Sequence, residues 1–239
     1  MAGRGGSYST YASLSSWPQI AGERGFICAF PMAGYGRQLD NGIGNVSMWN
    51  RGTDDVNFLR YMVDDIKANY NIDAGRVYAS GQSMGSMMST RISVTLGDVF
   101  TAIGSSCGAL PADALTSEHY TEEYDCPAFV IYGEKDATVG SYKLSESEGV
   151  KTMVEYYINR YDLQSVDEAA SYRSGAFNHY LFYNSEGVPM FRYSVVEGKG
   201  HANLPSESYL FYDEFFSKFY KDADGTLHYE NDTEVLDIR

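Results

Sequence analysis

Cysteine and proline are scarce in this 239-residue sequence, which contains three of the former and six of the latter. The cysteines Cys28, Cys107 and Cys126 do not have the spacing of a metal site, and they are too few for a dense disulfide framework. Cys28 lies in an apolar segment, where a buried free thiol is the ordinary interpretation. Cys107 and Cys126 could form a disulfide, and the sequence leaves that pairing open.

Basic residues are also few, since 18 lysines and arginines against 32 aspartates and glutamates give a net charge of 18 − 32 = −14. A surface this acidic repels nucleic-acid phosphates and anionic lipids, so we expect no nucleic-acid partner. No apolar run approaches the roughly 18 residues of a transmembrane helix, so no membrane partner is expected either. The first residues, Met1–Ser7, lack the apolar core of a signal peptide, and the compartment stays unassigned.

Disorder is not expected, because hydrophobic residues make up 44% of the chain and glycine plus proline only 24 + 6 = 30 residues. The length fits one sizeable domain as easily as two small ones. Apolar segments typical of buried strands alternate with amphipathic stretches typical of helices. Strands are predicted at 26–31, 76–80, 100–105 and 127–132, with a hairpin at 180–183 and 190–196. Helices are predicted at 8–23, from a Thr53 cap to Tyr70, and at 84–96, 150–161 and 206–220. We therefore predict a single α/β domain over residues 1–239, with a mostly parallel sheet flanked by helices and a polar tail at 221–239.

The segment Gly81-Gln-Ser83-Met-Gly85 places a serine between a predicted strand and a predicted helix. Gly-x-Ser-x-Gly at such a turn is typical of a nucleophile elbow, in which the glycines let strand and helix pass closely. The alternative is an ordinary turn serine. In its setting, the motif predicts that Ser83 is a catalytic nucleophile.

Two further polar residues follow predicted strands at the same edge of the sheet. Asp136 follows the strand that ends near Gly133, and His201 follows the strand that ends near Val196. The order Ser, Asp, His is that of the α/β-hydrolases. His201 would take the proton of Ser83, and Asp136 would orient the imidazole.

Alternatives to this triad come from its surroundings. Glu134 is a second candidate for the acid, Asp136 could be a turn carboxylate, and His201 could be a satisfied loop histidine. His119, His179 and His228 lie in polar or hairpin contexts and are weaker candidates for the base.

An acyl-transfer site also needs N–H donors for an oxyanion. The backbone N–H of Met84 supplies one, because it follows the nucleophile. We predict the N–H of Arg4 as the second, with Gly3 as the loop glycine and Ala2 where a histidine is usual. An unstructured Gly/Arg segment at the N-terminus is the alternative.

With these residues assigned, the chain resembles the polyhydroxybutyrate-depolymerase and feruloyl-esterase branch of the α/β-hydrolases. The resemblance runs from Gly3 to about Tyr220. It rests on Gly3-Arg-Gly-Gly, Trp17 before Ala21-Gly-Glu-Arg-Gly-Phe26, Phe30-Pro31, Trp49 before Thr53-Asp-Asp-Val56, Asp73-Ala-Gly-Arg-Val-Tyr78 and the elbow itself.

The resemblance implies hydrolysis of a carboxylic ester through an acyl-enzyme on Ser83, without a metal or organic cofactor. It implies ester substrates such as feruloylated or acetylated plant polysaccharides, short polyesters or aryl esters, and an extracellular location. Trp49, Met48 and Tyr35 would lie on loops that border the active site. Trp49 would stack on the substrate, unless its ring packs under the loop.

One departure from the family concerns the start of the chain. Family members have strands before the loop that holds Gly3, and one of them lies beside the nucleophile strand. We therefore expect a sheet that lacks an interior strand between Phe26–Pro31 and Arg76–Ser80. Truncation of a longer protein is the preferred explanation. In a second explanation, another segment of the chain or a partner fills the gap, and the partner could be a second copy bound at the exposed edge. In a third, the two strands pair directly with each other.

Two other functions compete with an esterase. A catalytically impaired hydrolase-like module that binds a carbohydrate or a partner is favoured by the incomplete oxyanion loop. A peptidase of the same fold is less favoured, because the sequence holds no accompanying propeller or gating domain.

Overall fold

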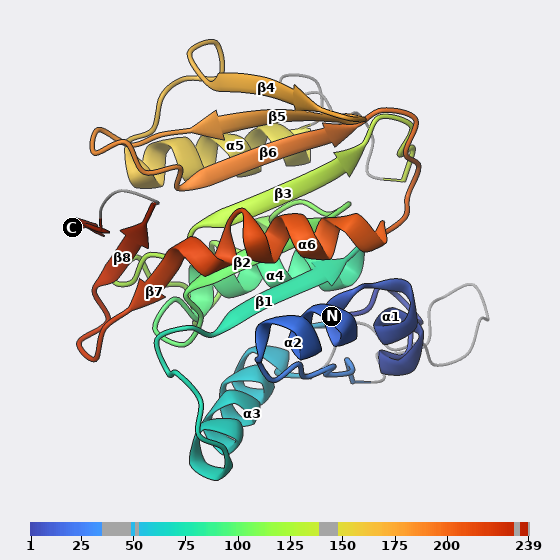
Figure 1. Cartoon of the computed structure of the whole chain (residues 1–239), viewed down its shortest axis with the longest axis vertical. Helices are drawn as coiled ribbons and strands as arrows, with labels where there is room; N and C mark the ends of the chain where they lie inside the picture. Colours follow the sequence, from blue (N-terminus) through green and yellow to red (C-terminus); the bar gives the residue numbers. More distant parts are fainter. Residues whose placement is uncertain (35–48, 51–52, 139–147, 232–234, 239) are drawn as a thin grey trace.

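A six-stranded, mostly parallel sheet organises the chain in a computed structural model that describes residues 1–34, 49–50, 53–138, 148–231 and 235–238 (Figure 1). Its strands are β1 (Tyr78–Gln82), β2 (Ala102–Ser106), β3 (Ala128–Gly133), β4 (Ala170–Ser174), β5 (Phe177–Phe182) and β6 (Phe191–Val196). Their order is β1-β2-β3-β6-β5-β4, parallel from β1 to β6 and antiparallel at the β5 and β4 end. The α/β prediction is confirmed.

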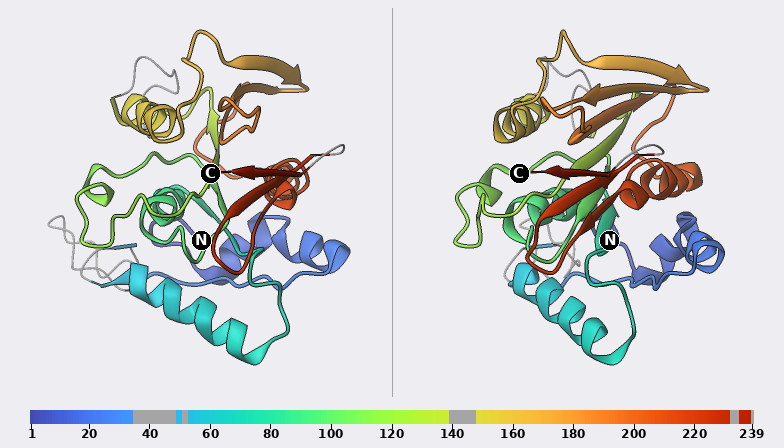
Figure 2. Two further views of the ribbon diagram at one scale, coloured as in Figure 1. Left: turned by 90° about the vertical axis from the view of Figure 1, so that its left-hand side faces the viewer. Right: turned by 60° about the vertical axis from the view of Figure 1, so that its left-hand side comes forward.

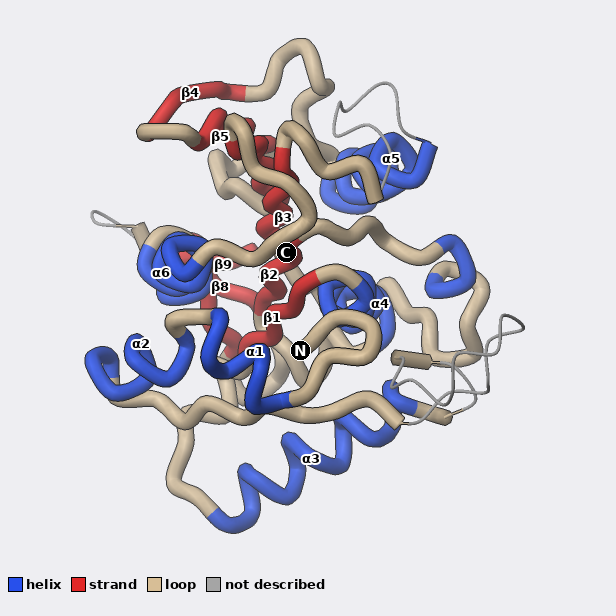
Figure 3. Tube along the Cα trace, turned by 90° about the vertical axis from the view of Figure 1, so that its right-hand side faces the viewer, coloured by secondary structure: helices blue, strands red, loops and turns tan. Residues whose placement is uncertain are grey.

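Helices cover both faces of this sheet. They are α1 (Tyr8–Leu14), α2 (Trp17–Arg24), α3 (Asp55–Asn69), α4 (Met84–Thr95), α5 (Glu148–Tyr161) and α6 (Pro205–Asp213), with single 3-10 turns η1 (Ala112–Ala114) and η2 (Phe216–Lys218). Figure 3 shows α4 and α5 on one face and α6 on the other. Strands β2, β3 and β6 are buried along their whole length, because both of their faces are covered. None of the helices in the described ranges has the length and hydropathy of a membrane span.

The predicted helix over residues 8–23 is two helices instead. Helix α1 ends at Leu14 with Ser15 as its C-cap, and Pro18 lies in the first turn of α2, where its missing N–H costs no hydrogen bond. The cap of α3 also differs from the prediction. Asp54, not Thr53, accepts a hydrogen bond from the N–H of Asn57.

The C-terminal region is more ordered than the predicted polar tail. Helix α6 ends at Asp213, and strands β7 (Phe219–Lys221), β8 (Leu227–Glu230) and β9 (Val235–Ile238) then form a separate antiparallel sheet (Figure 2). Leu227 and Phe219 are buried in the core, which gives this small sheet an apolar anchor. The sequence did not predict these strands, because polar residues alternate with only a few apolar ones there.

The predicted strand Phe26–Pro31 is not a strand in the structure, since no described strand pairs with it. As a result β1 lies at the end of the sheet, and helices α1, α2 and α3 lie beyond its edge. The segment has the apolar composition of a strand, but a strand needs a neighbour to pair with, so the prediction is wrong here. Cys28, Cys107 and Cys126 are all free thiols.

Candidate functional site

Ser83 lies at the turn between β1 and α4 in a conformation that side chains rarely adopt, with φ of 57° and ψ of −120°. A Cβ atom on Gly81 would lie 2.2 Å from the backbone of Gly85, and a Cβ on Gly85 would lie 2.2 Å from the carbonyl oxygen of Met1. Both glycines are therefore required by close backbone approach. The turn presents Ser83 Oγ beyond the carboxyl end of the strand.

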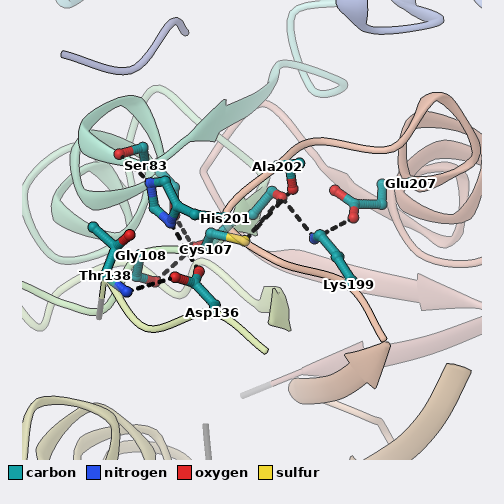
Figure 4. Close-up of polar contacts among 12 residues, drawn as sticks. Ser83, Cys107, Gly108, Asp136, Thr138, Lys199, His201, Ala202 and Glu207 are labelled. Atoms are coloured by element: carbon teal, nitrogen blue, oxygen red, sulfur yellow. Dashed lines mark hydrogen bonds and ion pairs between the residues drawn. The ribbon is translucent and has the colours of Figure 1, made fainter. Parts of the chain in front are cut away.

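The structure brings Ser83, His201 and Asp136 together in one hydrogen-bonded chain (Figure 4). His201 Nε2 lies 2.8 Å from Ser83 Oγ, and His201 Nδ1 lies 2.8 Å from Asp136 Oδ2. The Asp136 side chain is fully buried, whereas that of His201 is 23% exposed. In such an arrangement the imidazole can take the proton of the hydroxyl during nucleophilic attack, and the carboxylate stabilises the imidazolium that forms.

The surroundings of Asp136 favour its ionised form. Burial raises the pKa of this carboxyl, but hydrogen bonds from His201 and from the N–H of Thr138, 3.0 Å away, outweigh it and bring the pKa below its ordinary value. Glu134, the other candidate acid, instead accepts a hydrogen bond from the N–H of Gly198 at 2.8 Å.

The remaining histidines have other partners. His119 lies 3.5 Å from Asp54, and His228 lies 3.1 Å from Asp222. His179 is buried in the sheet, where Ser194 is its hydrogen-bond partner at 2.6 Å.

The loops that carry the acid and the base are tied to each other. The N–H of Lys135 donates to the carbonyl oxygen of Lys199 at 2.8 Å. A Cβ on Gly133 would lie 2.3 Å from that same oxygen, so the two loops touch at a position that only glycine fills. This contact fixes the distance between Asp136 and His201.

A buried ion pair lies next to the loop that carries His201. The Lys199 ammonium lies against the Glu207 carboxylate and 3.2 Å from Ser106 Oγ, with side chains that are 2% and 0% exposed. Burial raises the pKa of Glu207, and the nearby Lys199 counteracts this. Sequence reasoning missed the pair, because nothing in Gly198-Lys-Gly-His201 signals that this lysine points inward.

Cys107 is the third residue that sequence reasoning did not place at the site. It adopts φ of 61°, and its Sγ donates to the carbonyl oxygen of Ala202 at 3.6 Å. Its Sγ and one ligating atom each of Asp136 and His201 lie within 4.8 Å of one another, which is close enough to hold a metal ion. In the structure, however, each of these groups is already engaged in a hydrogen bond.

Of the two predicted oxyanion donors, Met84 follows Ser83 directly in the chain, and Arg4 follows a glycine that lies against Ser83. Met84 is the first residue of α4, and a Cβ on Gly3 would lie 3.0 Å from Ser83 Cβ, so the chain approaches the serine closely just before Arg4. Arg4 itself is exposed in a turn closed by a hydrogen bond from Gly6 to Gly3.

Of the three predicted substrate residues, Trp49 is the one within the described residues. The Trp49 ring is only 5% exposed, and its Nε1–H donates to the carbonyl oxygen of Ala2 at 2.9 Å, so it supports the N-terminal loop from beneath. Tyr35 and Met48 lie outside the described residues.

Comparisons with curated proteins find esterases and a polyester depolymerase. Poly(3-hydroxyalkanoate) depolymerase C of Paucimonas lemoignei is 24% identical over 221 residues, which cover 78% of this chain and 50% of that protein. Acetylxylan esterase A of Emericella nidulans is 30% identical over 118 residues, 49% of this chain and 38% of that protein. The chain thus spans half or less of the length of these relatives. No family model matches it.

Solved structures are similar over most of the chain. An acetyl xylan esterase from Aspergillus awamori aligns with a TM-score of 0.63 at 13% identity, over 90% of this chain and 86% of that one. SOBER1 of Arabidopsis thaliana aligns with a TM-score of 0.60 at 15% identity, over 90% and 93%. At these identities the likeness shows the fold alone. The resemblance noted in the sequence is confirmed by the relatives, and the fold by the structures.

Proposed function

We propose that this chain, which has the α/β-hydrolase fold, hydrolyses carboxylic esters through an acyl-enzyme on Ser83. The observation that supports this most directly is the chain of two 2.8 Å hydrogen bonds from Ser83 through His201 to Asp136. The esterases among the relatives point to the same reaction class.

In the acylation step, Ser83 Oγ attacks the ester carbonyl carbon while His201 Nε2 takes the hydroxyl proton. The ionised Asp136 accepts the Nδ1–H bond and stabilises the imidazolium that forms. His201 then gives the proton to the departing alcohol. In the second half, water attacks the acyl-enzyme with His201 as the base, which releases the acid and restores Ser83.

The tetrahedral oxyanion would be bound by the backbone N–H groups of Met84 and Arg4. The former lies at the start of α4, where N–H groups have no partner within the helix. The latter depends on the loop that Gly3 brings against Ser83. Loss of one such donor typically raises the activation barrier by about 3–4 kcal/mol.

For the substrate we propose acetyl or feruloyl esters of plant polysaccharides, or short polyesters. The names of the relatives support the first and the last of these classes, since they are acetylxylan esterases and a poly(3-hydroxyalkanoate) depolymerase. Trp49, Met48 and Tyr35 stay proposed as residues that border the substrate, Trp49 through the loop that it supports.

A fluorophosphonate probe tests the nucleophile. We expect labelling of the parent chain and none of Ser83→Ala, with Ser86→Ala as a matched control, since Ser86 is buried and bonded to Ser105. Hydrolysis of p-nitrophenyl acetate, acetylated xylan, methyl ferulate and poly(3-hydroxybutyrate) film then ranks the substrates. A parent chain that neither labels nor hydrolyses any of them would favour the alternative, a catalytically impaired module that binds a carbohydrate or a partner.

A further inference from the structure

A thiol, a carboxylate and an imidazole gather where three neighbouring strands end. Cys107 follows β2, Asp136 follows β3 and His201 follows β6, and these strands lie side by side in the sheet. Cys107 Sγ and one ligating atom of each of the other two residues lie within 4.8 Å of one another. No second group of three such residues occurs in the part of the chain that the structure describes. The cysteine therefore adds a third donor to two that the proposed triad already holds together.

These three groups are donors that suit Zn²⁺. Thiolate, imidazole and carboxylate are its usual protein ligands, and a site with three protein ligands leaves a fourth position to water. Mg²⁺ and Ca²⁺ instead take oxygen ligands and bind poorly to thiolate and imidazole. With the thiol and the carboxyl both ionised, the donors carry two negative charges, which a divalent cation neutralises. The donor set thus selects a thiophilic divalent cation.

The spacing of the donor atoms is close to that of a tetrahedral site. Bond lengths of about 2.0–2.3 Å place the ligand atoms of Zn²⁺ roughly 3.3–3.6 Å apart. His201 Nδ1 and Asp136 Oδ2 are 2.8 Å apart, so ligation would separate them by about half an ångström. Cys107 Sγ would approach them by no more than about 1.2 Å. Side-chain rotation supplies shifts of this size.

The backbone that carries the three donors is already in place. The N–H of Cys107 donates to the carbonyl oxygen of Ile131 at 2.9 Å, which continues the pairing of β2 with β3 beyond the strand end. The loops of Asp136 and His201 are joined by the hydrogen bond between their backbones. Because the donors are assembled before an ion arrives, binding has to order little of the chain.

The imidazole is the open side of this group. The side chains of Cys107 and Asp136 are buried, whereas that of His201 is 23% exposed. An ion therefore reaches the donors past the imidazole ring. The net charge of −14 draws cations toward the protein surface.

Hydrogen bonds engage the three groups, and an ion would replace the protons of two of them. Cys107 Sγ donates to the carbonyl oxygen of Ala202. His201 Nδ1 faces the ionised Asp136 carboxylate, so the imidazole proton lies on Nδ1. Metal ligands must be free of protons. The thiol proton would leave to solvent, and the imidazole proton would move to Nε2, because a neutral imidazole keeps one N–H.

We propose that Cys107, Asp136 and His201 bind Zn²⁺ or another thiophilic divalent cation through Sγ, a carboxylate oxygen and Nδ1, with water as the fourth ligand. An imidazole that is ligated at Nδ1 carries its proton on Nε2, the atom 2.8 Å from Ser83 Oγ. A protonated Nε2 cannot take the proton of Ser83. The ion therefore inhibits the esterase reversibly, a consequence that rests on the proposed function.

Binding is tested in Ser83→Ala, so that the result does not depend on catalysis. Co²⁺ is the probe, because a cobalt–thiolate bond has a charge-transfer absorption that Co²⁺ bound only to nitrogen and oxygen lacks. We expect this absorption to reach a plateau at one Co²⁺ per chain and to disappear when Zn²⁺ is added. A chain without this absorption at millimolar Co²⁺ would overturn the proposal.

Cysteine variants in the same background identify the thiolate. Cys107→Ser should abolish the absorption and weaken Zn²⁺ binding by at least about 100-fold, since loss of a group that only orients a metal ligand already costs about 10–100-fold. Cys28→Ser is the matched control and should keep both. Circular dichroism shows whether each variant is folded, and Cys107→Ala takes the place of Cys107→Ser if that variant is not. An absorption that survives the loss of Cys107 would overturn the proposal.

Histidine variants identify the imidazole in the same way. His201→Ala should weaken Zn²⁺ binding to a similar extent as Cys107→Ser. His119→Ala is the control, because His119 also lies beside a carboxylate, that of Asp54 at 3.5 Å, and should leave binding unchanged. The reverse order of the two histidine variants would place the ion elsewhere and overturn the proposal.

Inhibition is measured with Ser83 intact. Zn²⁺ should lower kcat for p-nitrophenyl acetate with little change in KM, because the ion acts on the base and leaves the ester free to bind. EDTA should restore kcat, Mg²⁺ and Ca²⁺ should not lower it, and Cys107→Ser should have the same kcat with and without Zn²⁺. Equal inhibition of Cys107→Ser and the parent would overturn the proposed inhibition.

The ion site and the esterase fail separately in these experiments. A cobalt–thiolate absorption in a chain that hydrolyses no ester would keep the ion site and reject the esterase. Ester hydrolysis that Zn²⁺ leaves unchanged, in a chain without the absorption, would reject the ion site and keep the esterase.

Discussion

The Lys199 ammonium and the Glu207 carboxylate form an ion pair out of contact with solvent, two residues from His201. Removal of one partner leaves the other charge buried and unpaired, which typically costs about 3–5 kcal/mol. Lys199→Met should therefore lower the free energy of urea-induced unfolding by about that amount, and Glu207→Gln by a similar one. The double variant Lys199→Met/Glu207→Leu should be more stable than Lys199→Met alone. Additive losses in the double variant would contradict the coupling.

Substitutions can distinguish whether Asp136 or its neighbour Glu134 is the acid of the proposed triad. Asp136→Asn keeps the shape of the side chain but favours the wrong imidazole tautomer, and it should lower kcat by about 10³–10⁴-fold. Glu134→Gln is the matched control, since Glu134 accepts a bond from Gly198 and should leave kcat close to that of the parent. Kinetics with p-nitrophenyl acetate measure both. A larger loss in Glu134→Gln would move the role of the acid to Glu134.

The elbow glycines should not tolerate a side chain. In Gly85→Ala, the new Cβ would lie 2.2 Å from the carbonyl oxygen of Met1 and 2.5 Å from that of Ala2. We expect lower stability and displacement of the Met1–Ala2 loop, seen as faster hydrogen exchange at Gln82. Gly22→Ala serves as the control, because a Cβ atom at this position would have no neighbour within 4 Å. Gly22 lies in α2, where alanine should raise the free energy of unfolding by up to about 1 kcal/mol. Equal behaviour of the two variants would exclude the close approach as the cause.

Stability should depend on pH through the Met1 amino group. Its pKa falls from 8.0 to about 5 in the folded chain because of burial, so between these values the unfolded state binds more protons. Stability is therefore highest above pH 8 and decreases as the pH falls toward 5. Urea unfolding at a series of pH values should show this decrease in the free chain and a smaller one after acetylation of Met1. Identical profiles would show that the ammonium is not buried.

Strands β1, β2, β3, β5 and β6 and the three triad candidates could be predicted from the sequence because both depend on local patterns. Apolar runs predict strands, and the residues after Tyr132 and Val196 fall at one edge of a parallel sheet. The structure brings Ser83 and His201 together across 118 positions, as that geometry requires.

Other features depend on contacts that the sequence does not display. Phe26–Pro31 has a strand composition, but pairing depends on a neighbour and not on the segment itself. Lys199 and Glu207 are charged residues whose burial follows only from where β6 and α6 meet. Strands β8 and β9 were not predicted from the sequence, because polar residues alternate there with only a few apolar ones. One of these apolar residues, Leu227, is buried in the core.

Cys107 brings a thiol close to the imidazole and the carboxylate of the proposed triad. A thiol beside an imidazole would ordinarily compete with a hydroxyl as nucleophile, since a thiolate reacts far faster. Here burial raises the pKa of the Cys107 thiol, which favours its protonated form, and Sγ donates to the carbonyl oxygen of Ala202. With a protonated thiol, the proposed reaction has the Ser83 oxygen as its nucleophile, and alkylating reagents selective for thiolates should leave the activity intact.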